Sequence, residues 1–301
     1  AAVLAANQWS IDEIRNGMAW EGLNMGMGDE VIATAQARAA GRRVRVLDKN
    51  GNQRWHALWA GNSNIAIPGE VCEGSIVNGS SARPYIDYDR MQEDYVGLIP
   101  GGVWNSKRRD ARLPWRFTDW SCDAVGPGDL YLTDAERALA QPVLVVEPHV
   151  KASAMPGKRW AFARYAAVVK ARPDLPWAQF DYGFPILPGV RRIATRSFRE
   201  ACGVLSGAIG YLGSEGGLHH ASAALGIPAV VIFGGVISPR TTGYRMHRNL
   251  FRDDPAAIGA RVLTRAAARA IEAITVDEVL EALETLNATP ESQAARRRVA
   301  P

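Results

Sequence analysis

Short hydrophobic runs alternate with amphipathic stretches through the second half of the chain, beginning near residue 143. Runs rich in β-branched residues predict buried strands, and stretches with a 3.6-residue period predict helices. The expected strands are 143–147, 177–181, 208–212 and 229–233, and the expected helices are 160–172, 197–205, 219–225 and 275–287. Regular alternation of this kind predicts a doubly wound α/β sheet.

The first half has a weaker pattern. A capping-box spacing at residues 10–13 predicts a short helix, and glycines between 22 and 28 predict a loop. A helix should begin at Asp29 and end near Ala40, before a strand at 44–48. Between 51 and 128 only short strands are indicated, at 75–77 and 95–99, and their order in a sheet is not predictable. A further capping box at 133–136 opens a short helix.

The length of 301 residues favours two domains rather than one core. We place the boundaries at 1–140, 141–275 and 276–301, the last being a terminal helix with a basic tail. A hydrophobic fraction of 47% with 22% charged residues is typical of a globular protein, and no apolar run is long enough to span a membrane. The expected location is the cytoplasm, either free or held peripherally at the inner membrane face.

The cysteines and the distribution of charge limit the kinds of site and of binding partner to be expected. Cys72, Cys122 and Cys202 are scattered without a paired motif, which indicates neither a disulfide framework nor a zinc site. The net charge is +4, with basic residues gathered at 107–116 and 296–298. A solvated surface is the favoured interpretation of both clusters; a polyanionic partner, such as a phosphorylated glycolipid or a nucleic acid, is the alternative.

A glycine-rich turn at 213–217 lies between an expected strand and an expected helix, where unpaired backbone amides attract phosphate. Lys158 precedes another helix, a position that the helix dipole disfavours unless an anion binds there. Ligands of open α/β sheets bind at the carboxyl ends of the strands. The polar loop residues expected there include His149, Ser153, Lys158, Asp181, Thr195, Glu215, Gly216, Gly217 and Gly234.

Three segments in this order resemble the family 9 glycosyltransferases, the heptosyltransferase-like enzymes of the GT-B fold. They are GMGDEVIAT, GKRW and SEGGLHHASAALGIPAVVIFGG. The family's Gly-x-Gly-Asp loop corresponds to Gly26, Gly28 and Asp29, and its Lys-x-Trp to Lys158 and Trp160. Its Asp-[Thr/Ser]-Gly-x-x-His turn corresponds to the six residues from Glu215 to His220, and its Phe-Gly strand end to Phe233 and Gly234.

The resemblance implies two Rossmann-like domains facing each other across a cleft, with the acceptor held by the first and a nucleotide sugar by the second. It implies inverting transfer with Asp29 as the base and Gly26 and Gly28 in the acceptor-side loop. On the donor side it implies Lys158 and the Gly216 and Gly217 amides around the diphosphate. Further donor contacts are expected from Ser153, Asp181, Thr195, Glu215, His220 and Gly234. Neither a cofactor nor a metal is expected.

Each role has a structural alternative. Asp29 could serve only as a helix N-cap, and Lys158 could be a surface lysine. His219 and His220 are adjacent on a helix, so their side chains should diverge by about 100° and make poor joint metal ligands. We expect His220 to pack and orient the turn. Glu215 stands where the family usually has Asp, and Gly216 where it has a hydroxyl residue, which suggests a different donor.

Four functions compete at this point. The favoured one is transfer of a sugar to a surface glycan or a lipopolysaccharide-type saccharide. A second is transfer to a modified base in DNA, with the basic cluster at 107–116 contacting phosphates. A third is a GT-B protein that binds a nucleotide sugar without turning it over. A fourth, an epimerase, would need an acid and a base on the donor side, where the sequence offers only Glu215.

Overall fold

The computed structural model describes residues 26–78, 83–98, 113–150 and 155–286. Its centre is a parallel sheet of six strands in the order β5-β4-β3-β6-β7-β8. The strands are β3 (Leu144–Glu147), β4 (Trp177–Asp181), β5 (Arg191–Ala194), β6 (Gly210–Ser214), β7 (Ala229–Gly234) and β8 (Arg248–Phe251). The strand order reverses direction between β3 and β6, which is the switch point where doubly wound sheets bind ligands.

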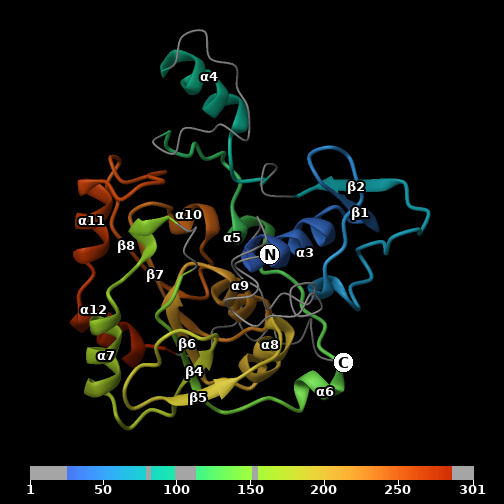
Figure 1. Ribbon diagram of the computed structural model, residues 1–301. Coiled ribbons are helices and arrows are strands. Elements are labelled where there is room, and N and C mark those ends of the chain that lie inside the picture. The colour runs from blue at the N-terminus through green and yellow to red at the C-terminus, as the bar shows by residue number, and fades with distance from the viewer. Residues whose placement is uncertain (1–25, 79–82, 99–112, 151–154, 287–301) are drawn as a thin grey trace.

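Helices cover both faces of this sheet (Figure 1). One face carries α7 (Phe162–Ala171), α11 (Arg265–Glu272) and α12 (Val276–Glu284), and the other carries α8 (Phe198–Ser206) and α9 (Gly217–Ala224). The 3-10 turn η2 (Pro156–Lys158) and the short α10 (Pro239–Thr242) complete this half. Strands β3, β6 and β7 are buried along their whole length, as expected of a sheet covered on both faces.

The first half is smaller and less regular. The helix α3 (Met27–Ala39) leads to β1 (Val44–Leu47), which pairs in parallel with β2 (Gly74–Val77). The 3-10 turn η1 (Ala57–Trp59) packs under α3, and α4 (Tyr88–Leu98) projects from the top of the molecule in Figure 1. The short helices α5 (Cys122–Val125) and α6 (Asp134–Arg137) lead into β3.

Most of the periodic elements were predicted correctly. Strand β4 has the expected bounds, and the capping boxes at Thr133 and Thr275 both form. The strand expected at 95–99 is wrong, because these residues belong to α4. The side chain of Asp87 accepts a hydrogen bond from the Arg90 amide at 2.9 Å and so favours a helix there. Helix α3 begins two residues earlier than expected, and β5, β8 and α11 were not foreseen. The helix expected at residues 10–13 and the basic tail lie outside the described residues.

The two halves share one hydrophobic core, in which α3 packs against α9. Arg199 on α8 ties them together on one side: it forms an ion pair with Glu136 and donates to the carbonyl oxygens of Ala57 and Tyr131. On another side the Trp115 amide donates to the Gly259 carbonyl at 2.8 Å. Among the described residues, none of the helices combines the length and apolar character that a bilayer crossing requires.

Candidate functional site

The first turns of α3 and α9 lie directly against each other. A Cβ atom at Gly28 would lie 2.6 Å from His220 Cδ2, and one at Gly217 would lie 2.9 Å from the Cβ of Met27. The glycines therefore let the two helices approach. Neither helix has a side-chain cap at its N-terminus. The partial positive charge of both helix starts is thus directed toward one region, between the two halves of the chain.

Asp29 lies in this region, and each oxygen of its buried carboxylate accepts a hydrogen bond. The Tyr85 hydroxyl donates to Oδ1 at 2.6 Å, and Arg83 Nε donates to Oδ2 at 2.9 Å. The N-cap of α3 is Gly26, three residues before Asp29, so the alternative that Asp29 is merely the cap is wrong. Instead, the Asp29 carboxylate is held by Tyr85 and Arg83, which belong to a different segment of the chain.

Glu215 is the second buried carboxylate of the region. Lys158 Nζ forms an ion pair with Oε2, and His220 Nε2 lies 3.4 Å from Oε1. Burial alone would raise the pKa of Glu215, but the Lys158 ammonium, followed by His220, holds it well below its ordinary value. His220 is oriented by a 2.8 Å hydrogen bond between Nδ1 and the Tyr244 hydroxyl. A lysine and a carboxylate from two motifs of the sequence therefore meet here.

His219 lies behind this pair in a cluster of rings formed with His220, Phe233, Tyr244 and His247. Burial depresses the pKa of His219 far below its usual range, so the ring is neutral. Among the residues that the structure describes, neither of its ring nitrogens has a hydrogen-bond partner.

The expectation that His219 and His220 diverge is wrong. Their rings are 4.6 Å apart, and one ligand atom from each lies within 4.8 Å of a Glu215 oxygen. Helix geometry sets only the directions in which neighbouring Cβ atoms point, and the side-chain torsions beyond them allow two adjacent rings to approach. These three residues could hold a metal ion by type. Lys158 already supplies a positive charge to Oε2 of Glu215.

Other expected site residues lie along the carboxyl edge of β3, β4 and β5. Asp181 ends β4, where it pairs with Arg192 and accepts from the Gly183 amide at 3.0 Å. Thr195 follows β5 and is buried. The strand order separates both from the Glu215 turn by at least one strand. Each is thus at a strand end, as expected, but neither contacts Lys158 or Glu215 in the hydrogen bonds of the described chain.

The remaining expected residues are two glycines, an arginine of the basic cluster and residues outside the described chain. Gly234 ends β7 with φ +67°, and a Cβ there would lie 2.7 Å from the Gly157 carbonyl oxygen, so it makes room for the turn that carries Lys158. A Cβ at Gly216, in front of α9, would meet only the Ser214 carbonyl oxygen, at 4.0 Å, so a side chain would fit there. Arg116 of the basic cluster pairs with Asp94 at 2.5 Å. Ser153 and the basic residues at 107–112 lie outside the described residues.

Glu147 was not foreseen as a functional residue. It ends β3 at the switch point, and the His149 amide donates to its Oε1 at 2.8 Å. Its Oε2 has no partner within the described part of the chain. Burial raises the pKa of Glu147 to about 8, so the carboxyl group is largely protonated at neutral pH. Its protonated group can donate a hydrogen bond at the carboxyl edge of the six-stranded sheet.

This carboxyl group predicts a pH dependence of stability. Between pH 4.5 and about 8 the folded chain keeps a proton on Glu147 that the unfolded chain has lost. The free energy of unfolding should therefore fall as the pH rises through this window, and level off above it. At ~1.4 kcal/mol per pKa unit the total loss is on the order of 5 kcal/mol. Glu147→Gln, which cannot titrate, should flatten this slope in urea unfolding at pH 5.5, 7.0 and 8.5. An unchanged slope would contradict the assignment.

Arg83 and Tyr85 were also missed from the sequence. They lie in an irregular segment before α4, and neither periodicity nor a motif marks them. Their role depends on contacts with a residue more than fifty positions away. The only available signal was the unusual density of aromatic and arginine residues between 51 and 128.

No family model and no curated protein matches the sequence. Solved structures do match. A family 9 glycosyl transferase from Veillonella parvula aligns over 90% of this chain and 99% of its own, with a TM-score of 0.53 and 14% identity. The E. coli ADP-heptose lps heptosyltransferase II aligns over 86% and 94%, with a TM-score of 0.45 and 14% identity. E. coli heptosyltransferase WaaC, solved with ADP, aligns over 54% and 50%, with a TM-score of 0.39 and 16% identity.

The likeness to the V. parvula structure shows a shared fold. The chain has the α/β GT-B fold, in which two Rossmann-like domains face each other. The fold places the starts of α3 and α9, and with them Asp29 and Glu215, at the junction of the two halves. At 14% identity the likeness shows the fold and not the substrate.

Proposed function

We propose that this protein is an inverting glycosyltransferase, which moves a hexosyl or heptosyl group from a nucleotide-diphosphate sugar to an acceptor hydroxyl. The observation that carries the proposal is the meeting of α3 and α9. It brings the first turn of α3, which carries Asp29, against His220, whose Nε2 lies 3.4 Å from the carboxylate of the Lys158–Glu215 pair. A base and a buried cation on opposite sides of one junction are what sugar transfer between two bound substrates requires.

In the proposed reaction Asp29 takes the proton of the acceptor hydroxyl. The acceptor oxygen then forms a bond to the anomeric carbon from the face opposite the leaving group, and the bond from that carbon to the diphosphate oxygen breaks. Lys158 and the amides at the start of α9 stabilise the negative charge that develops on the diphosphate. Glu215 holds Lys158 in place and lies beside the transferred sugar.

The positive charge at the leaving group is proposed to come from the protein rather than from a metal. Lys158 is already paired with Glu215, and its side chain is only 13% exposed, so it is fixed in the site. A lysine ammonium has three donors, and the carboxylate of Glu215 occupies one of them. The others remain for phosphate oxygens.

The acceptor is proposed to be a surface saccharide or a glycolipid, met in the cytoplasm or at the inner membrane face. A DNA acceptor is less well supported, because the described part of the basic cluster, Arg116, is neutralised by Asp94. Asp181, Thr195 and Ser153 are proposed to bind the nucleotide. Since Glu215 is one methylene longer than aspartate, we expect a donor sugar unlike that of the well-known heptosyltransferases.

Thermal unfolding with a panel of ligands tests this function. The panel contains the ADP, UDP, GDP, dTDP and CMP forms and their sugars, each with and without EDTA. One of them should stabilise the protein by about 2.7 kcal/mol at a hundred times its dissociation constant. The stabilisation should survive the chelator. Loss of the effect in EDTA would refute the metal-independent part of the proposal.

The same panel separates the alternatives. If no nucleotide stabilises the protein, the proposed donor site is wrong, and salt-dependent DNA binding becomes the next measurement. If a sugar nucleotide binds but is neither transferred nor hydrolysed, the protein is a non-catalytic nucleotide-sugar-binding member of the fold. Only binding together with release of the nucleoside diphosphate supports the enzyme.

A further inference from the structure

Both oxygens of the Asp29 carboxylate are engaged, each by a different donor. Tyr85 donates to one oxygen and Arg83 to the other, and both donors come from the segment at 83–87. Each carboxylate oxygen has two lone pairs, so each keeps one lone pair after these bonds. The two bonds therefore fix the plane of the carboxylate and leave it able to accept a third hydrogen.

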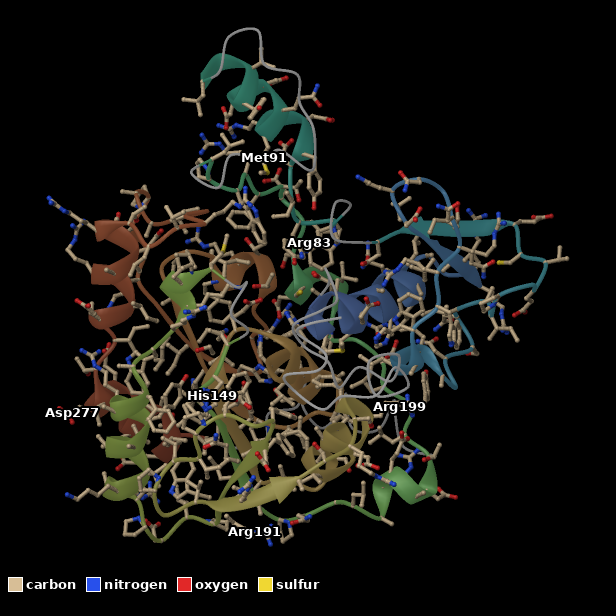
Figure 2. The ribbon with its side chains drawn as sticks, viewed as in Figure 1. Arg83, Met91, His149, Arg191, Arg199 and Asp277 are labelled. Atoms are coloured by element: carbon tan, nitrogen blue, oxygen red, sulfur yellow. The ribbon has the colours of Figure 1, made fainter. Side chains whose placement is uncertain are left out.

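Arg83 and Tyr85 are themselves held by aromatic side chains. The Arg83 guanidinium lies 5.1 Å from the centre of the Trp115 ring, and the Tyr85 ring lies 6.0 Å from that of Trp120 at a 40° tilt. The Thr118 amide also donates to the Tyr85 carbonyl at 3.2 Å. Figure 2 shows Arg83 at the foot of the segment that leads up to α4, where it contacts Asp29 of α3. Arg83 and Tyr85, the hydrogen-bond donors to Asp29, are therefore held by a third stretch of the chain, residues 115–120.

Both donors keep their protons under ordinary conditions. Burial raises the pKa of Tyr85 well above its usual value, with the neighbouring Asp29 charge acting in the same direction. Arg83 is charged at any working pH, and its side chain is 11% exposed. Tyr85 therefore donates to Asp29 rather than competing for its proton, and Arg83 balances the buried negative charge.

We propose that Arg83 and Tyr85 are positioning residues for the base Asp29, and that Trp115 and Trp120 hold them in place. This assignment rests on the proposed function. General base catalysis needs the accepting oxygen within hydrogen-bond reach of the acceptor hydroxyl. Misplacement of a reacting group by about 1 Å can cost on the order of a hundredfold in rate. A carboxylate on the first turn of a helix has free side-chain torsions unless something locks them, and these two donors do so.

A purely structural ion pair is the competing interpretation, and it predicts a different pattern. If Arg83 and Tyr85 only stabilise the fold, their loss lowers the melting temperature and the amount of active protein. It should not change the rate per folded molecule. If they position Asp29, their loss lowers kcat and leaves the binding of the donor, which lies on the other half of the chain, unchanged.

The experiment measures release of the nucleoside diphosphate from the sugar nucleotide that the ligand panel selects, with water as the acceptor. Tyr85→Phe keeps the ring on Trp120 and removes only the hydroxyl, and kcat should fall roughly tenfold with KM for the donor unchanged. Arg83→Met should lower kcat about a hundredfold, and Arg83→Lys should recover part of it, since a lysine restores the charge but not the fixed geometry. Tyr95→Phe on α4 is the matched control and should retain the wild-type rate.

The assignment alone is overturned by a wild-type kcat in Tyr85→Phe, or by a loss in both variants that appears in the KM for the donor. A rate loss that follows only the fraction of folded protein would also overturn it. If the wild-type protein binds the sugar nucleotide and releases no product, the proposed function itself fails, and this assignment fails with it. Binding and turnover in the wild-type protein therefore separate the two failures.

Discussion

Asp29→Asn is expected to abolish sugar transfer while leaving donor affinity within about twofold of the wild type. General base catalysis contributes ~10²–10⁴-fold, and an amide cannot take the acceptor proton. In the proposed function the donor binds to Lys158 and the α9 amides, which belong to the other half of the chain, so its affinity should not depend on the Asp29 charge. Donor hydrolysis gives the rate, and thermal shift by the nucleotide gives the affinity.

The substitution has a second effect that must be separated from the first. Arg83 pairs with Asp29 in a largely buried site, and loss of one member of a buried pair costs roughly 3–5 kcal/mol because it leaves a charge uncompensated. The double variant Asp29→Asn with Arg83→Gln removes both charges. It should regain stability without regaining activity.

Glu30→Gln provides the matched control on the same turn of α3. Glu30 is also buried, but its carboxylate pairs with Arg54 rather than with Arg83. This variant should keep the wild-type rate. Full activity in Asp29→Asn, or loss of donor binding in it, would contradict the assigned role of Asp29.

Local patterns predicted the second half of the chain well, because its elements follow simple rules. Strand β4 and the capping boxes at Thr133 and Thr275 depend on residues close together in sequence. A covered parallel sheet also demands continuous apolar runs, which are visible without a structure. The switch point of the sheet could therefore be located in advance.

The first half resisted prediction for the opposite reason. In the sequence, Val96 and Leu98 favour a strand. In the structure both lie exposed on α4. The hydrogen bond by which Asp87 caps this helix outweighs their preference for a strand. Strands β1 and β2 have four residues each and pair across an intervening stretch of irregular chain. Short strands joined at a distance leave no periodic signal.

The residues of the candidate site also differ in whether a local sequence pattern marks them. Lys158 and Glu215 stand in recognisable motifs, so their meeting could be expected. Arg83 and Tyr85 become relevant only through tertiary contact with Asp29, and no local pattern marks them. The sequence marks Glu147 only as a polar residue at the end of a strand. Only the packing of the complete sheet shows that it is buried and protonated.

Lys158→Met is expected to weaken nucleoside diphosphate binding by roughly 10- to 100-fold, since hydrogen bonds to charged groups are worth about 1.5–3 kcal/mol. Methionine nearly preserves the length of the side chain while removing its charge. The turnover rate should fall as well, because the same ammonium is proposed to stabilise the departing diphosphate. Titration calorimetry with the diphosphate that the panel selects gives the affinity, and Lys170→Met, on the exposed side of α7, is the control.

The stability of this variant distinguishes a ligand-binding lysine from a structural one. Without Lys158, the Glu215 carboxylate loses its ammonium partner in a buried site, so Lys158→Met should unfold more easily. Adding Glu215→Gln removes the remaining charge and should restore stability. If Lys158 serves only to neutralise Glu215, this double variant should also bind the nucleotide normally. If Lys158 binds phosphate, affinity stays low in a protein that is again stable, and this is the result we expect.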